Sequence, residues 1–182
     1  SYEDKRPELT NAQRKMLSHY DNATLYNDSI VAQIVKRFQK QDAIVIYVPD
    51  HGEECYEENR GFICRNHSAE IDWPLAHYEV EIPFWIYCAP KYIRNHRDIY
   101  RQIRKAKDKR FMTDALPHLL LYLAGIETPT YKEEYNILSP KYDEMRPRIL
   151  KNSADYDKLR DAHLEKIKKE ESKKVIKKER RN

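Results

Sequence analysis

The stretch Ala43-Ile44-Val45-Ile46-Tyr47-Val48-Pro49-Asp50-His51-Gly52-Glu53 decides the fold class of this 182-residue chain. Its first six residues are continuously apolar and mostly β-branched, a pattern typical of a strand buried on both faces in a parallel sheet covered by helices. Pro49 ends the strand, because proline has no amide hydrogen to donate to a neighbouring strand. The polar residues that follow are then expected at the carboxyl end of a strand, where ligands gather in open α/β sheets.

The remaining elements alternate around this strand. In chain order we predict a helix that follows the capping-box pair Thr10 and Gln13 and ends near residues 39–41, a second buried strand over 82–88, a helix over 95–107 with Asn95 as a cap, and a helix over 116–124 between Thr113 as cap and Gly125. This order predicts an α/β layered domain. Two strands are fewer than the ~4–6 of a complete open sheet, so the pattern is typical of part of a fold.

The net charge is distributed unevenly along the chain. Residues 151–182 hold 12 Lys and Arg against 7 Asp and Glu, so they carry more than the whole net charge of +4, and the first 150 residues are close to neutral. A nucleic-acid surface needs basic residues clustered on the folded body, so nucleic acid is not a predicted partner. The basic stretch 151–182 is predicted to be a tail, helical or disordered, and contact with a membrane surface is an alternative for it. No apolar run approaches the ~20 residues of a membrane-spanning helix.

Three cysteines limit the disulfide chemistry. Cys55 and Cys64 lie in one polar stretch and are as well explained by a single bridge as by free thiols. Cys88 ends an apolar run and is predicted to be a buried thiol. The 3 glycines exclude the glycine-rich phosphate-binding loops of nucleotide-binding folds.

Asp50 and His51 are the first candidates for chemistry. A carboxylate and an imidazole at one strand end offer zinc two donors at ~2.0–2.2 Å, and Glu53 and Glu54 could orient the imidazole. A polar turn between strand and loop explains the same residues equally well. Zinc sites usually have three or four protein donors. Further donors are therefore expected from the polar segment of residues 50–81, or from outside the chain.

His67 is the candidate donor within that segment, which shows no clear periodicity; loops of this length are usually functional. It lies in a polar context near Arg60 and Arg65, two possible anion contacts. His77 and His118 stand among apolar neighbours and are predicted to be structural. No G-x-S-x-G elbow is present, and the pair Cys64 and His67 is a weak signal for nucleophilic catalysis.

Five stretches carry a further signal when they are taken together: Tyr20-Asp21-Asn22-Ala23-Thr24-Leu25-Tyr26-Asn27-Asp28, Val45 to Glu53, Ile82-Pro83-Phe84-Trp85-Ile86, Met112 to Leu120 and Leu123-Ala124-Gly125-Ile126. Together they resemble the catalytic domain of bacterial phosphoethanolamine transferases, which are sulfatase-like members of the alkaline phosphatase superfamily. The Asp-His-Gly-Glu piece alone is shared with sulfatases and phosphodiesterases generally. The resemblance covers roughly residues 15–150 and implies an α/β/α sandwich of the alkaline phosphatase and sulfatase type, present here in part.

The resemblance also implies roles for individual residues. Asp50 and His51 match the strand-end zinc ligands of the family. His67 best matches a later loop histidine that contacts the metal or the phosphoryl group, although this chain has Asn66-His67-Ser68 where better-known members have His-Gly. One or two zinc ions are the implied cofactor, with the site incomplete in this chain.

Family members carry their threonine nucleophile, an acidic metal ligand, a substrate-binding histidine and membrane helices upstream of the Tyr20 helix, where this chain has 19 residues. We therefore expect residues 1–150 to be the C-terminal part of such a catalytic domain, with the nucleophile upstream of residue 1 and little activity of its own. The implied reaction moves phosphoethanolamine from a phospholipid, through a covalent intermediate, to lipid A or a related envelope glycan. Its implied place is the periplasmic face of the bacterial inner membrane. A sulfatase or phosphodiesterase, and a non-enzymatic binding fragment, are the alternatives.

Overall fold

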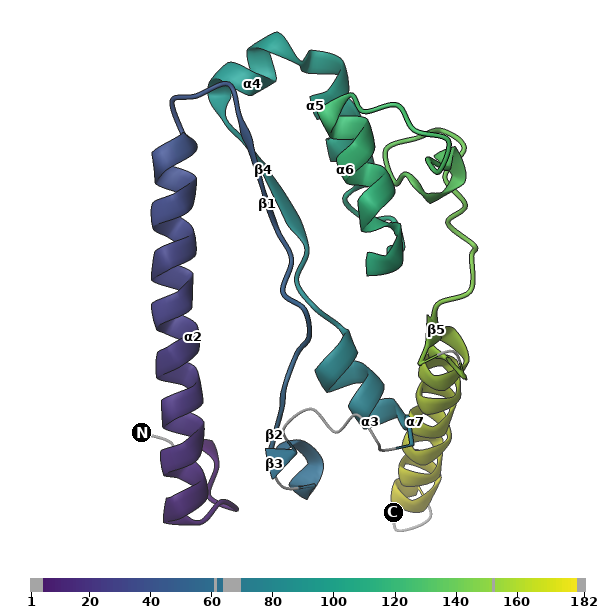
Figure 1. Ribbon diagram of the computed structural model, residues 1–182. Helices are drawn as coiled ribbons and strands as arrows, with labels where there is room; N and C mark the ends of the chain where they lie inside the picture. Colours follow the sequence, from purple (N-terminus) through teal and green to yellow (C-terminus); the bar gives the residue numbers. More distant parts are fainter. Residues whose placement is uncertain (1–4, 61, 64–69, 152, 180–182) are drawn as a thin grey trace.

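The structure, a computed structural model, describes residues 5–60, 62–63, 70–151 and 153–179. Its elements are α2 (Asn11–Phe38), β1 (Ile44–Tyr47), β2 (Glu54–Cys55), η1 (Glu57–Asn59), β3 (Phe62–Ile63), α3 (Trp73–Leu75), η2 (Ala76–Val80), β4 (Trp85–Cys88), α4 (Pro90–Asn95), α5 (Arg97–Ala106), η3 (Thr113–Ala115), α6 (Leu116–Ala124), η4 (Glu133–Tyr135), β5 (Ile149–Leu150), β6 (Ala154–Asp155) and α7 (Tyr156–Glu179). They form an open frame, in which the long α2 stands beside the β1–β4 ribbon and α7 lies at the opposite side (Figure 1).

The two predicted strands, β1 and β4, pair with each other. Ile44 lies opposite Cys88 and Tyr47 opposite Trp85, and the rings of this last pair stack with centroids 5.1 Å apart. The pairing is antiparallel, so the prediction of a parallel sheet is wrong for this pair. The residues of β1 are half-buried rather than buried on both faces. A run of apolar residues reports how much burial a strand needs, but not the direction of the neighbouring strand.

The segment between these strands is more ordered than its sequence predicted. Described residues in it form the short pair β2 and β3, the single helical turn α3 and the π-helical turn η2. Asp72 caps α3, because its carboxylate accepts a hydrogen bond from the amide of Leu75 at 3.0 Å. Each element is too short for its periodicity to show in the sequence.

The main core lies between α5, α6 and the loop that follows α6. Leu119 is fully buried there with Ile137 and Leu138. Gly125 has φ +65° at the end of α6, as predicted for a glycine that closes a helix. Thr113 does not cap α6 but begins the 3₁₀ turn η3, and the predicted helix over 95–107 breaks at His96, so that Asn95 ends α4 rather than capping α5.

Helix α2 begins with the predicted capping box. The Thr10 hydroxyl accepts from the amide of Gln13, and the Gln13 side chain accepts from the amide of Thr10 at 2.8 Å. The helix ends at Phe38, one residue before the predicted end near residues 39–41. Leu17 is the one residue of α2 that is buried, and it packs with Leu9, Cys55 and Tyr56.

The basic end of the chain is helical as α7, one of the two forms predicted for it. Its first turn packs onto the body, where Tyr156 joins a cluster with Ala76 and Leu150. The rings of His163 and Trp73 stack with centroids 5.2 Å apart. Separation of residues 151–182 from the rest as a tail stays a prediction. Across the described ranges, the helices lack the combination of length and apolar character that crossing a bilayer requires.

Candidate metal site and the cavity beside it

Asp50 and His51 lie directly after β1, at the strand end where the sequence placed them. The Asp50 side chain is 81% exposed and the His51 side chain 28% exposed. His51 Nε2 and Asp50 Oδ2 are 3.6 Å apart, so a ring nitrogen and a carboxylate oxygen face one another. Adjacent residues therefore present two donors to the same point.

The other ring nitrogen of His51 is held by the backbone. Nδ1 lies 2.7 Å from the carbonyl oxygen of Gly52, and because a carbonyl can only accept, Nδ1 carries the hydrogen and donates it. In the neutral ring this leaves the lone pair on Nε2, the atom that faces Asp50. Metal-binding histidines are typically held in this way, with the second nitrogen donating to a carbonyl or carboxylate.

Gly52 seats this turn against η2. Its amide donates to the carbonyl of Glu79 at 2.9 Å, and a Cβ atom at position 52 would lie 2.2 Å from the carbonyl oxygen of Tyr78. Real Cβ atoms do not approach backbone that closely. The position therefore requires glycine, because two backbone segments meet there.

These two donors fit a zinc ion in kind and spacing. Tetrahedral ligands at ~2.0–2.2 Å from zinc are about 3.3–3.6 Å apart, close to the 3.6 Å between His51 Nε2 and Asp50 Oδ2. Over the part of the chain that the structure describes, no group of three or more His, Cys, Asp and Glu is arranged to hold a metal ion. His67, the predicted third contact, lies outside the described residues, as do Cys64 and Arg65.

Neither Glu54 nor Arg60 takes the role suggested by the sequence. Glu54 is fully buried and accepts from Arg60 Nε at 2.6 Å, and Arg60 also bonds Asp72. Burial raises the pKa of Glu54 in spite of this arginine. Glu54 therefore does not orient His51, and Arg60 is held by two carboxylates. The Glu53 carboxylate lies 3.7 Å from His51 Nδ1, farther than the Gly52 carbonyl.

The histidines predicted to be structural have aromatic neighbours. His77 stacks on Trp73 with centroids 5.4 Å apart. His118 is half-buried rather than fully packed, and its Nδ1 accepts from the amide of Lys132 at 3.1 Å while its ring contacts Tyr131 and Tyr135.

A cavity of about 710 Å³ opens beside Asp50 and His51. Segments distant in the sequence line it, and the basic residues among them carry no local sequence signal for a binding site. Its other lining residues are Ile71, Leu75, Glu79, Val80, Glu81, Ile82, Phe84, Lys107, Lys109, Phe111, Met112, Thr113, Arg148, Ile149, Leu150, Lys151 and Tyr156. The strand-end turn at Asp50 and His51 therefore lines the same cavity as the basic residues of segments 107–109 and 148–151.

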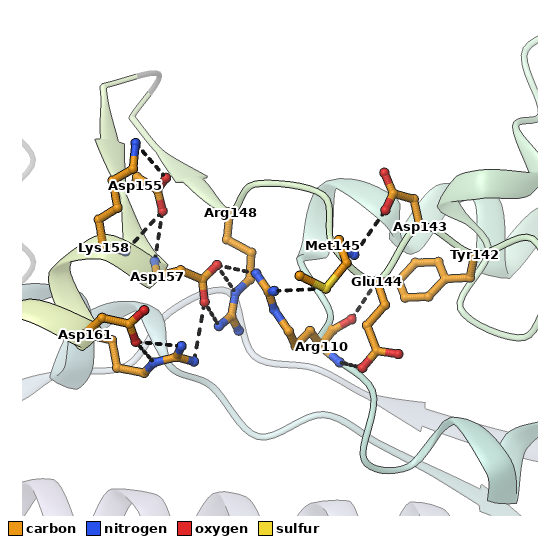
Figure 2. A network of polar contacts seen from close by, with 11 residues as sticks. Arg110, Tyr142, Asp143, Glu144, Met145, Arg148, Asp155, Asp157, Lys158 and Asp161 are labelled. Atoms are coloured by element: carbon orange, nitrogen blue, oxygen red, sulfur yellow. Dashed lines mark hydrogen bonds and ion pairs between the residues drawn. The ribbon is translucent and has the colours of Figure 1, made fainter. Parts of the chain in front are cut away.

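A network of arginines surrounds Asp157 at the edge of this cavity (Figure 2). Arg148 bonds both carboxylate oxygens through Nε and Nη2, at 3.2 and 2.6 Å, and Arg110 bonds the same group. Arg160 approaches it at 3.4 Å. The hydrogen bonds from Arg148 lower the pKa of Asp157, with attraction to the three arginines adding to the effect.

Tyr156, the neighbour of Asp157, also lines the cavity. Its hydroxyl donates to Glu81, and the Arg148 guanidinium lies 4.3 Å from the centroid of its ring. Burial, together with the bond to Glu81, raises the pKa of Tyr156 to about 12. The phenol therefore stays protonated at neutral pH and holds Glu81 as a hydrogen-bond donor.

Three curated relatives are phosphoethanolamine transferases. The chain is 30% identical over 161 residues to phosphoethanolamine transferase EptC of Escherichia coli strain RS218, a match that covers 84% of this chain and 26% of the relative. It is 29% identical over 99 residues to the Kdo(2)-lipid A phosphoethanolamine 7''-transferase of E. coli K12 (53% of this chain, 16% of the relative) and 32% identical over 93 residues to EptA of Helicobacter pylori (50% and 17%). The chain thus spans about a quarter of the length of its EptC relative.

Solved structures agree with these matches. The C-terminal periplasmic domain of E. coli EptC superposes with a TM-score of 0.66 at 28% identity, over 83% of this chain and 43% of that domain. The same domain has been solved in complex with Zn, again with a TM-score of 0.66 at 28% identity, over 83% of this chain and 42% of that domain. The predicted α/β fold of the sulfatase type, present in part, is confirmed. The Sulfatase family model matches residues 1–126, and the chain therefore belongs to the sulfatase family.

Proposed function

We propose that this chain is part of a zinc-dependent phosphoethanolamine transferase. The observation that carries the proposal is the strand-end pair: His51 Nδ1 is held by the Gly52 carbonyl, and Nε2 faces the Asp50 carboxylate. The similarity to EptC and EptA favours transfer of phosphoethanolamine over the other reactions of the family.

Asp50 and His51 would hold the ion. Bound zinc would supply Lewis-acid stabilisation of the charge on the transferring phosphoryl group. The role of His51 is positional: its Nδ1 hydrogen bond fixes the ring so that Nε2 needs no reorientation when the ion binds. His67 is proposed to contact the phosphoryl group, on the strength of the family resemblance alone.

The remaining catalytic groups, including the nucleophile, are proposed to come from a part of the domain outside these 182 residues. The apolar face of α2 supports this proposal, because Leu25, Tyr26 and Ile34 are exposed there. An antiparallel pair such as β1 and β4 is at best marginally stable without further strands or a covering layer. The N-terminal half of a sulfatase-type domain would supply that cover.

The proposed donor is a phospholipid, and the proposed acceptor is lipid A or a related envelope glycan. The names of the relatives support both, and the solved EptC domains support a periplasmic location for the whole protein. Membrane association would come from segments outside this chain.

Zinc binding tests the metal assignment directly. In calorimetric titrations of the chain with zinc, we expect weak binding that Asp50→Asn or His51→Gln reduces by at least about ten-fold, since each removes one of few donors. His19→Gln, a substitution on the exposed surface of α2, is the matched control and should leave the affinity unchanged. Equal zinc affinity in all four proteins would refute the assignment.

Transfer itself is tested in the longer protein that contains this segment. Its expression in a bacterial host should add phosphoethanolamine to lipid A or another envelope glycan, as detected by mass spectrometry. The Asp50→Asn variant should lose the modification while its abundance in the membrane fraction stays the same. Release of sulfate from sulfate esters without phosphoethanolamine transfer would instead assign the protein to the sulfatases proper.

A further inference from the structure

We propose that the cavity beside Asp50 and His51 binds a phosphate ester of an amphiphilic substrate through its basic wall, defined as Lys107, Lys109, Arg148 and Lys151. Asp157 acts as the positioning residue for Arg148. The inference rests on the proposed function, because it gives that site a substrate-binding surface. It assigns roles to residues that lie outside the strand-end turn.

The basic wall lies beside the strand-end pair. The basic wall and the strand-end pair line the same cavity of about 710 Å³, although they come from segments more than 50 residues apart. A pocket of this size, within the usual ~300–1,000 Å³ of ligand sites, can hold a lipid headgroup. A phosphate in it would share the cavity with the basic wall and the two zinc donors.

The Arg148 guanidinium is fixed in place by Asp157 and Tyr156. Its bonds to Asp157 use Nε and Nη2, which leaves Nη1 outside that pair, and its guanidinium lies over the Tyr156 ring. A guanidinium fixed by a carboxylate and an aromatic face loses little freedom when it binds an anion. Figure 2 shows Arg148 and Arg110 converging on Asp157.

The charges around Asp157 favour an anion. Three arginines contact its carboxylate, and Arg160 also bonds Asp161 at 2.9 Å. Three cations therefore stand against two carboxylates, and the cluster keeps an excess of positive charge beside the cavity. Lys109 adds a further cation, since one bond to the Ile137 carbonyl at 3.1 Å uses only part of its donor capacity.

The carboxylates of the cavity lie on other segments. Glu81 accepts from the Tyr156 hydroxyl through one oxygen, and its other oxygen lies 3.0 Å from His77 Nδ1. Glu79 is only 5% exposed, and Asp50 belongs to the proposed zinc site. The acidic lining residues are therefore Asp50, Glu79 and Glu81, and the basic ones are Lys107, Lys109, Arg148 and Lys151. Lys107 also lies 3.6 Å from Asp108, which is not a lining residue.

Apolar side chains also line the cavity, which indicates that its ligand is an amphiphile. Phe84, Phe111, Met112 and Ile149 line the cavity with the basic residues. A free phosphate ion would gain nothing from them, whereas the glycerol and first methylenes of a lipid would, at roughly 0.8 kcal/mol per buried methylene.

Binding without zinc tests this surface separately from the metal site. The chain, in chelator-treated buffer, is titrated calorimetrically with dihexanoyl phosphatidylethanolamine below its micellar concentration, with glycerophosphoethanolamine and with inorganic phosphate. We expect the short-chain lipid to bind most tightly. Arg148→Gln should weaken it at least about ten-fold, the effect of losing one hydrogen bond between charged groups. Lys105→Gln, an exposed position on α5 outside the cavity, is the charge-matched control.

A double variant covers the case in which Arg148→Gln unfolds. Lys107→Gln/Lys109→Gln leaves the Asp157 network intact and should also weaken lipid binding. Where Arg148→Gln folds, Asp157→Asn should weaken binding less than it does, with partial recovery in low salt, because the arginine remains but is no longer held. Absence of lipid binding, equal loss in Lys105→Gln, or inorganic phosphate binding as tightly as the lipid would each overturn the proposal. Success here with no phosphoethanolamine transfer in the longer protein would refute the proposed function alone.

Discussion

Helices α6 and α2 are both rich in apolar residues, yet they meet opposite surroundings. Leu119 of α6 is fully buried among residues of α5 and of the loop after α6. Leu25 of α2 is 68% exposed, and Tyr26, Ile30 and Ile34 beside it are exposed as well. Figure 1 shows the reason, since α6 lies between α5 and the loop that follows it, whereas α2 runs alongside one narrow ribbon.

The difference shows that the chain supplies all the residues that bury α6 but leaves much of the apolar face of α2 exposed. The α5–α6 core draws on residues 84–142, a single continuous portion of the sequence. The apolar face of α2 has no equivalent partners among the described residues, apart from the small cluster around Leu17. Apolar spacing therefore reports that a face is to be buried, and not whether the same chain supplies the cover.

Matched leucine substitutions give the largest effect and test this comparison first. Leu119→Ala should lower the free energy of unfolding by about 2–5 kcal/mol, because it leaves a cavity in a closed core. Leu25→Ala, the same change on an exposed helix face, should cost no more than about 0.5 kcal/mol. Urea denaturation followed by circular dichroism measures both. Similar losses in the two variants would show that α2 is covered in solution, for example by a second copy of the chain.

Two glycines give an intermediate effect, one at the end of α6 (Gly125) and one in the strand-end turn outside both helices (Gly52). Gly52→Ala forces a Cβ atom against the Tyr78 carbonyl and should cost about 1–3 kcal/mol. Gly125→Asn, at the end of α6, should cost less than about 1 kcal/mol, because asparagine tolerates the left-handed backbone and the space there is open. Thermal unfolding compares them. A smaller loss for Gly52→Ala than for Gly125→Asn would contradict the close backbone contact at the strand-end turn.

Acid should give the smallest effect on stability. It acts through Asp157 of α7, whose carboxylate accepts hydrogen bonds from Arg110 and Arg148. The pKa of Asp157 is lower in the folded chain than the ordinary 3.8, so its contribution to stability is present above about pH 4 and is lost as the pH falls through the lowered value. Asp157→Asn should flatten the fall of unfolding free energy as the pH drops below about 4. Asp161→Asn, a more exposed neighbour, is the control. An unchanged pH profile in Asp157→Asn would exclude this carboxylate as the source.

Local patterns in the sequence predicted the local structure well. The capping box at Thr10, the left-handed Gly125 and the strand end before Asp50 each depend on neighbours within a few residues, and all three are present. The same patterns placed Asp50 and His51 at one point, because adjacent residues after a strand cannot be far apart.

Other features were beyond local patterns. The helix breaks at His96, where Asn95 donates to Asp42 at 2.7 Å and His96 lies 3.3 Å from the same carboxylate, and Thr113 begins the turn η3. Contacts with a residue more than 50 positions away are not encoded in the weak preference of single residues for cap positions. Arg148 reads as one basic residue in a loop rich in proline and charge. Only the approach of residues 107–110 and 156–157 gives it a carboxylate, an aromatic face and a place beside the strand-end turn.

The sequence by itself determined the α/β class, the two strands, the strand-end pair of possible zinc donors and the resemblance to phosphoethanolamine transferases. These depend on residue type and short spacing. The tertiary structure decided the antiparallel pairing of β1 with β4, the requirement for glycine at position 52, and the shared cavity of Asp50 and Arg148. The physical reason is that strand direction, backbone contact and charge clustering arise between segments many residues apart, and no periodicity along one segment encodes them.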